Sequence, residues 1–188
     1  MGDARTDEEL MTDVSRGNLG AYSALVDRHH ERVLNTAYGM TGDEEASRDV
    51  AQETFMRILK HAAMYTPRAK FTTFLYTVVR NIVVETGRRT ARRREVPLGD
   101  AWVMETPGPE AADRIAERHE LRTRLADALA ELPEQLRDAF VLSEIEGLRY
   151  REIAEICGCP EGTIASRKHL AIEKLRGLLG EFDRGREK

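Results

Sequence analysis

Residues 150–176 read Tyr150-Arg-Glu-Ile-Ala-Glu-Ile-Cys157, Gly158-Cys-Pro160, then Glu161-Gly-Thr-Ile-Ala-Ser-Arg-Lys-His-Leu-Ala-Ile-Glu-Lys-Leu-Arg176. It predicts a helix, a tight turn and a second helix. Gly158 can adopt the positive φ of the turn, and Pro160 fits the first helical position, where no N–H is needed. Ile164 would hold the second helix on the first. Such a helix-turn-helix places its second helix in the DNA major groove, so the sequence predicts DNA binding.

The second predicted helix has one inward and one outward face. At 100° per residue, the inward face carries Ile164, Lys168, Ala171, Ile172 and Leu175. The outward face carries Ser166, His169, Leu170 and Glu173, with Thr163 and Ala165 at its edges. We expect Leu170 to meet a thymine methyl, and Ser166 and His169 to reach base edges or phosphates. The candidate phosphate contacts that flank this face are Arg167, Lys168 and Lys174. The alternative is an ordinary amphipathic helix with one stray leucine.

The 188 residues are enough for one or two small domains. No apolar run approaches the roughly 18 residues of a membrane span, and the polar, acidic start of the chain is unlike a signal peptide. We therefore expect a cytoplasmic protein that does not insert into membranes. Cys157 and Cys159 lie in the turn, and a lone C-x-C supplies too few ligands for a structural zinc site. We expect small turn residues there; a redox or metal switch is the alternative.

Charge is distributed unevenly along the chain. The net charge is −4, which argues against a protein that simply coats DNA. Residues 61–95, however, hold two acids and eight bases, a net charge of +6, between acidic stretches on both sides. We expect a polyanion to bind at residues 68–94 and to make a second contact with the recognition helix. The acidic stretches would be free to meet a basic protein.

Almost every segment has a helical pattern. The predicted helices cover residues 6–17, 19–40, 44–62, 72–88, 110–131 and 134–145, before the helix-turn-helix. The Pro- and Gly-rich stretch 96–109 is typical of a linker. The expected fold is all-α, with two small helical domains joined by a flexible linker and a helix-turn-helix ending the second. The expected boundaries are a first domain at 1–95, a linker at 96–112, a second domain at 113–180 and a charged, frayed tail at 181–188.

One stripe in the predicted helix 44–62 suits protein docking. Its residues, spaced i, i+3, i+4 and i+7, are Asp49, Gln52, Glu53 and Met56. The stripe adjoins the apolar face, which includes Phe55 and Leu59. We expect it to lack a basic partner at i+4 and to dock on a basic helical surface. The alternative is a solvated helix face.

The segment Lys70–Asn81 interleaves aromatic residues with hydrogen-bond donors and leads to an arginine run. Unstacked bases bind on aromatic faces, and arginines hold phosphates. Tyr65 or Phe71 could supply the stacking, and Asn81 could bond a base edge. The cationic candidates for the same strand are Lys70, Arg80, Arg88, Arg89 and Arg92. The residues expected to be mostly helix core are Phe74, Leu75, Val78, Val79 and Ile82.

Together these motifs resemble the extracytoplasmic-function (ECF) group of bacterial RNA polymerase sigma factors, over roughly residues 19–94 and 114–179. The string Asp49-Val-Ala-Gln52-Glu53-Thr-Phe55 is similar to the family's core-binding motif. Phe74–Asn81, followed by two arginines, is similar to its promoter-melting helix. The segments similar to its second DNA-binding domain are Leu132–Phe140, Gly147–Ala154 and Gly162–Arg167.

The resemblance implies a promoter-specificity subunit that binds core RNA polymerase, needs no cofactor and performs no chemistry. The stripe Asp49–Met56 would dock on the basic clamp helices of the β′ subunit, and the second domain would meet the β flap. The loop from Tyr65 to Phe71, with Asn81, would capture a flipped base of the −10 element. The side chains that would read the −35 element are Ala165, Ser166, Arg167, His169 and Leu170. An anti-sigma partner is also implied.

The chain departs from the family's pattern at a few positions. The family often has tryptophan at Phe74, aspartate at Glu85, and arginines at Leu170 and Ile172. The departures in the recognition helix imply a weaker basic contact at the −35 element. They also imply an unusual preference, with a thymine- or adenine-rich patch under Leu170.

Three other functions are compatible with parts of the chain. A stand-alone helix-turn-helix regulator would bind a palindrome as a dimer and leave the stripe Asp49–Met56 without a role. A metal-dependent hydrolase could use His29 and His30, but adjacent helical residues point about 100° apart and cannot comfortably share a metal. A redox sensor could use Cys157 and Cys159 to displace the recognition helix. No small-molecule substrate motif is present.

Overall fold

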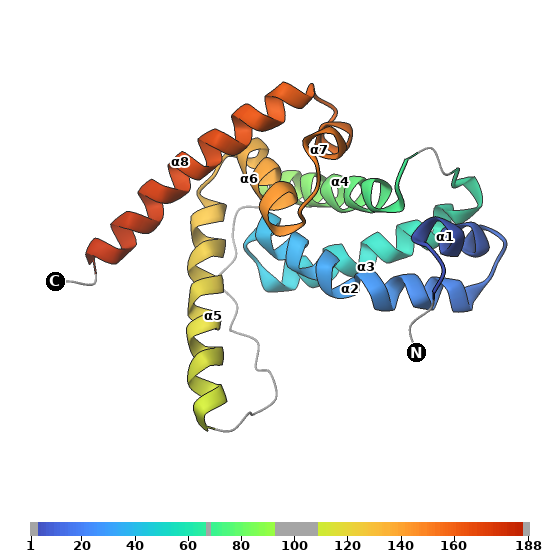
Figure 1. The fold of residues 1–188 in the computed structure, drawn as a ribbon, viewed down its shortest axis with the longest axis horizontal. Helices are drawn as coiled ribbons and strands as arrows, with labels where there is room; N and C mark the ends of the chain where they lie inside the picture. The colour runs from blue at the N-terminus through green and yellow to red at the C-terminus, as the bar shows by residue number, and fades with distance from the viewer. Residues whose placement is uncertain (1–3, 67–68, 93–108, 186–188) are drawn as a thin grey trace.

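The computed structural model describes residues 4–66, 69–92 and 109–185, and side chains over slightly shorter ranges. Its first helices are α1 (Asp7–Ser15), α2 (Leu19–Thr41), α3 (Glu44–His61), the 3-10 turn η1 (Ala62–Met64) and α4 (Phe71–Arg92). They are followed by α5 (Pro109–Ala130), α6 (Glu134–Phe140), the π-helical turn η2 (Val141–Ile145), α7 (Tyr150–Cys157) and α8 (Glu161–Gly185). The described part of the chain contains no strand, which confirms the all-α prediction (Figure 1).

The helices of the first domain, α1 to α4, lie close to their predicted bounds, except that α4 ends at Arg92 instead of residue 88. Thr6 and Glu9 form a capping box that starts α1, and Asp43 caps α3. Gly42 ends α2 with φ +70°, a conformation that other residues rarely adopt. Helices α2 and α3 pack along each other, and α4 packs against both (Figure 1). This arrangement buries Leu25, Ile58 and Tyr76 almost completely.

The second domain, α5 to α8, contains the helix-turn-helix. Gly158 ends α7 with φ +64°, and Ile164 is fully buried against α7, as predicted. The predicted helix 134–145 divides into α6 and η2, where the Glu146 N–H donates to the Val141 carbonyl at 3.1 Å. This i+5 bond marks a π-helical turn. Helix α8 continues to Gly185, so it includes the first five residues of the predicted tail.

The two domains lie against each other. Helix α4 contacts α7, and α2 contacts α5, α6 and η2. The buried apolar residues of both domains belong to one cluster. Residues 96–108 of the predicted linker 96–112 lie outside the described residues, and residues 109–112 already belong to α5. None of the described helices combines the length and apolar character of a membrane span.

Candidate nucleic-acid and protein interfaces

The outer face of α3 carries the side chains predicted to dock on a protein. Asp49 and Gln52 are exposed, and Met56 is 55% exposed. The expectation that this stripe has no basic partner is wrong. Arg57 lies four residues after Glu53 and donates from Nε to its carboxylate at 2.7 Å. The unpaired part of the stripe therefore consists of one acid, one amide and one methionine.

Arg57 also joins α3 to α4. Its Nη2 donates to the Glu85 carboxylate at 2.8 Å. Hydrogen bonds to Glu85 and then to Glu53 raise the pKa of Arg57 above its ordinary value. Leu59, predicted to be inward-facing, is 39% exposed. Because Leu59 lies about 60° around the helix from Met56, it adds an apolar contact beside the stripe.

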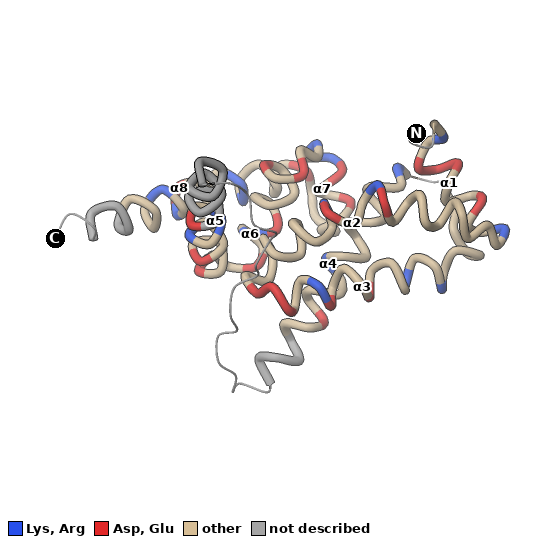
Figure 2. Tube along the Cα trace, turned by 90° about the horizontal axis from the view of Figure 1, so that it is seen from below, with Lys and Arg blue, Asp and Glu red and all other residues tan. Residues whose placement is uncertain are grey.

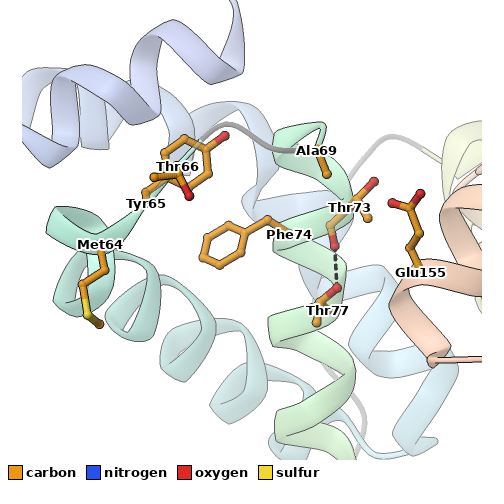
Figure 3. Close-up of a pocket in the computed structure, with 8 residues that line it drawn as sticks. All are labelled: Met64, Tyr65, Thr66, Ala69, Thr73, Phe74, Thr77 and Glu155. Carbon is orange, nitrogen blue, oxygen red and sulfur yellow. Dashed lines mark hydrogen bonds between the residues drawn. The ribbon is translucent and has the colours of Figure 1, made fainter.

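A half-open pocket of about 350 Å³ lies where the loop after η1 meets the start of α4 (Figure 3). It is lined by Met64, Tyr65, Thr66, Ala69, Thr73, Phe74, Thr77 and Glu155. The Tyr65 and Phe74 rings have centroids 5.6 Å apart and are tilted by 56°. The Thr77 hydroxyl donates to the Thr73 carbonyl at 2.7 Å on the same wall. Aromatic faces beside hydroxyl groups suit a base taken out of its stack.

Phe71 does not line this pocket. Its side chain is fully buried, and its ring packs on His29 with centroids 5.4 Å apart. The proposed stacking of Phe71 on a base therefore does not fit this structure. Phe74, predicted to be mostly core, supplies the second ring of the pocket instead. Periodicity could not separate the two aromatics, because residues three apart lie on nearly the same helical face.

Helix α1 supports the base of the pocket, a role that no sequence pattern indicated. The Phe71 N–H donates to the Glu8 carboxylate at 2.8 Å, which satisfies a backbone donor at the start of α4. Asp7 accepts from His29 Nε2 at 2.8 Å and pairs with Arg28 at 2.5 Å. Burial lowers the pKa of His29, although Asp7 opposes that change. The imidazole is therefore neutral at pH 7.

The basic residues predicted to hold the −10 strand differ in whether the structure shows an acidic partner for them. Lys70 Nζ pairs with the Glu152 carboxylate at 2.7 Å, and Arg80 Nε donates to Asp138 at 2.7 Å. Asn81 is exposed. The remaining candidates belong to the last turns of α4, but their side chains lie outside the described residues: Arg88, Arg89 and Arg92.

The faces predicted for the recognition helix are confirmed. Ile164 and Ala171 are fully buried, and Leu175 is 4% exposed. On the opposite face Leu170 is 47% exposed. The other predicted contacts are exposed, apart from the half-buried Thr163 and Arg167: Ala165, Ser166, His169 and Lys174. The structure therefore presents one apolar side chain among polar ones along the outward face of α8.

Two cations beside this face, Arg167 and Lys168, bind other residues of the second domain. Arg167 Nη2 donates to Gln135 Oε1 on α6 at 2.7 Å. Lys168 Nζ pairs with Glu144 at 2.5 Å and lies 5.5 Å from the centre of the Tyr150 ring. These bonds fix α8 on α6 and η2, whereas Lys174 is exposed. Acidic and basic segments alternate in both halves of the molecule (Figure 2).

The two cysteines are free thiols, Cys157 at the end of α7 and Cys159 in the turn before α8. Burial, and next the nearby Asp138, raise the pKa of Cys157 to about 11, so this thiol is protonated at neutral pH. A protonated thiol reacts slowly, which weakens the redox-sensor alternative. Among the residues that the structure describes, no three His, Cys, Asp or Glu side chains are grouped to hold a metal ion.

Each half of the chain matches a known protein family. Residues 25–93 match the family model for Sigma-70 region 2, and residues 122–175 match that for Sigma-70, region 4. The RNA polymerase sigma-H factor of Pseudomonas aeruginosa is 32% identical over 179 residues, which cover 90% of this chain and 91% of that protein. The ECF RNA polymerase sigma-E factor of Haemophilus influenzae is 31% identical, covering 95% of this chain and 98% of that protein.

A solved structure of CnrH, in complex with the cytosolic domain of CnrY, superimposes with a TM-score of 0.72. It is 25% identical, and the match covers 93% of this chain and 97% of that one. Both halves thus match the two sigma-70 regions, and relatives over 30% identical span nearly the whole length. On these matches, the chain belongs to the extracytoplasmic-function group of sigma-70 RNA polymerase sigma factors.

Proposed function

We propose that this ECF sigma factor directs promoter-specific initiation through three surfaces: the α3 stripe, the aromatic pocket with α4, and α8. As a sigma factor it binds core RNA polymerase and recognises −10 and −35 promoter elements. One observation supports this assignment: the three surfaces occur on one chain, in this order. A stand-alone helix-turn-helix regulator would need only α8. The proposed limits remain 1–95 and 113–180 for the two domains.

The α3 stripe is the proposed docking site for the β′ clamp helices, which are basic. The exposure of Asp49, Gln52 and Met56 supports this assignment. An exposed methionine adapts to irregular apolar surfaces, while the acid complements a basic partner. Glu53 would contribute once its ion pair with Arg57 is replaced by an ion pair with a cation of the polymerase. The second domain would meet the β flap.

The aromatic pocket is the proposed capture site for a flipped base of the −10 element. Tyr65 and Phe74 supply the rings, and Asn81 bonds a base edge nearby. Lys70, Arg80 and the arginines after Thr86 hold the strand's phosphates. Unstacking a base costs a few kcal/mol, so the pocket acts together with the polymerase rather than alone.

The outward face of α8 is the proposed reader of the −35 element. Leu170 would contact a thymine methyl, and Ser166 and His169 would reach polar base edges or phosphates. Lys174 would bind the backbone without regard to sequence. The exposure of these side chains on a helix fixed by a buried Ile164 supports the assignment.

The proposed partners are core polymerase, promoter DNA and an anti-sigma factor. The solved complex of the similar protein CnrH with the cytosolic domain of CnrY supports a protein partner besides the polymerase. The chain would work in the cytoplasm, where bacterial polymerase acts. It would take no cofactor or small-molecule substrate and would catalyse no reaction.

Run-off transcription on a promoter library, with and without the chain, tests this function. Wild-type chain with core polymerase should give start-site-specific transcripts. The double variant Gln52→Ala, Glu53→Ala should lower both the transcripts and co-elution with core enzyme by about tenfold, a change of about 1.4 kcal/mol. Glu31→Ala, exposed on α2, serves as a control and should change neither. No transcript and no co-elution would favour the stand-alone regulator.

A further inference from the structure

One arginine of α8 is held in place by an amide rather than by a carboxylate. Arg167 Nη2 donates to the side-chain oxygen of Gln135 on α6 at 2.7 Å. Its Nη1 donates to the Cys159 sulfur, a weaker acceptor, at 3.5 Å. In the part of the chain that the structure describes, no carboxylate pairs with the Arg167 guanidinium. The bond to Gln135 therefore fixes the direction of the guanidinium and leaves its positive charge uncompensated.

The next two basic side chains of α8 have acidic partners instead. Lys168 Nζ pairs with the Glu144 carboxylate at 2.5 Å, and His169 Nε2 lies 3.6 Å from the Glu173 carboxylate. A carboxylate beside a cation cancels much of the attraction that the cation exerts on a phosphate, whereas an amide carries no charge and does not. Arg167 is therefore better suited than either neighbour to bind an anion.

The position of Arg167 on α8 suits a phosphate rather than a base. Arg167, Leu170 and Lys174 are spaced i, i+3 and i+7, so they share one side of the helix. Leu170 and Lys174 are both exposed there. Arg167 lies about 60° around the helix from Leu170, toward α6. A recognition helix has base edges beneath its outward face and phosphates along both sides of the groove. A cation beside that face would therefore meet the DNA backbone.

An amide is not the side chain that would tie α6 to α8 most strongly. A carboxylate at position 135 would form a charge-assisted, often bidentate bond with Arg167. It would also be favoured in the first turn of α6, near the positive end of the helix dipole. Helix α8 is already held by the buried Ile164 and Ala171. What Gln135 adds is orientation, because a long side chain that is ordered in advance loses less entropy when it binds.

We propose that Gln135 is a positioning residue for promoter recognition: it holds Arg167 toward a backbone phosphate at the edge of the −35 element and leaves the arginine its full charge. Gln135 acts through Arg167 and needs no contact of its own with DNA. This role rests on the proposed function of α8, to which it adds a residue of α6.

The variant Gln135→Glu separates this role from a purely structural one. It keeps the acceptor but gives Arg167 an acidic partner. Binding of the holoenzyme to a promoter, measured over a range of salt concentrations, should weaken about tenfold, a difference of about 1.4 kcal/mol. The salt slope should shrink by about 1, as for the loss of one phosphate contact. The midpoint of urea unfolding of the full chain should not fall. A bond that only joins α6 to α8 predicts the same stability with unchanged promoter binding.

Two further variants separate orientation and general repulsion from the loss of charge. Gln135→Met keeps a long, uncharged side chain without the amide acceptor. It should weaken promoter binding about threefold and leave the salt slope unchanged, because Arg167 stays charged but must be ordered during binding. In the Arg167→Ala background, Gln135→Glu should change neither the affinity nor the slope. An equal loss with and without Arg167 would mean that the new carboxylate repels DNA directly, and would overturn the proposal.

The same measurements distinguish failure of this role from failure of the proposed function. If the wild-type holoenzyme binds its promoter and Gln135→Glu binds it equally well with the same salt slope, the positioning role is wrong and the function stands. If the wild-type chain gives core polymerase no promoter-specific binding at all, the proposed function is wrong and this role falls with it.

Discussion

The backbone N–H of Phe71 donates to the carboxylate of Glu8, which lies 2.8 Å away and 63 positions earlier in the chain. Helix α1 therefore caps the helix that carries the proposed −10 contacts. The bond ties α1 to the first residue of α4, three positions before Phe74 of the pocket. The N-terminal helix thus supports the helix that carries the proposed −10 contacts.

Glu8→Ala should weaken promoter melting without weakening core binding. The substitution removes a side-chain acceptor at a helix start, which typically costs about 1 kcal/mol. We expect a lower yield of open complexes and an unchanged co-elution with core enzyme. Glu9→Ala is the matched control, because Glu9 bonds the backbone of Thr6 within its own cap. Equal losses in the two variants would count against a specific role for Glu8.

His29 should make the stability of the first domain depend on pH. An unfolded histidine has a pKa near 6.5, and burial lowers the pKa of folded His29. The unfolded chain therefore binds more protons, and the free energy of unfolding falls as pH decreases through about 6.5. Urea titrations between about pH 7.5 and pH 5.5 should show this decline. The slope should shrink in His29→Gln and persist in the exposed control His30→Gln.

Leu170→Ala should alter base preference at the −35 element. Loss of its contact with a thymine methyl should reduce discrimination by about 0.8 kcal/mol, or roughly fourfold. Holoenzyme binding to promoters varied one base at a time measures this. Lys174→Ala provides the contrast, because losing a phosphate contact weakens binding to all sequences alike. An unaltered preference in Leu170→Ala would remove Leu170 from the reading face.

Cys157 should react slowly with alkylating reagents. Its pKa, raised to about 11 mainly by burial, leaves little thiolate at pH 7.5. Mass spectrometry of the variant Cys159→Ser, treated with iodoacetamide, should show a rate well below that of free cysteine. The rate should rise steeply with pH. Rapid labelling at pH 7.5 would revive the redox-sensor alternative.

Much of the fold follows from local sequence signals. The Thr6 and Glu9 capping box and the turn at Gly158 set helix ends through residues close in sequence. Apolar periodicity correctly predicted the buried face of α8, including Ile164 and Ala171. The π-helical turn was not predicted, because its i+5 bond has no comparable sequence pattern.

The site was only partly predictable because its long-range pairs leave no periodic signal. Arg80 binds Asp138 across 58 positions, and Glu8 reaches Phe71 across 63. Sequence alone identified Lys70 and Arg80 as cations. It did not show that each pairs with an acid that is buried or that caps a helix. It also could not distinguish Phe71 from Phe74 as the ring in the pocket. Spacing defines a helical face, whereas tertiary packing determines which part of that face is covered.

Promoter melting by this sigma factor can be measured by permanganate probing of unpaired thymines on a promoter selected from the library. With core polymerase and the wild-type chain, thymines of the −10 element should become reactive, and neither component alone should produce this. Asn81→Ala should reduce the reactivity about tenfold, a change of about 1.4 kcal/mol, while leaving core binding intact. Polymerase that binds the chain and the promoter but leaves every −10 thymine unreactive would contradict the account.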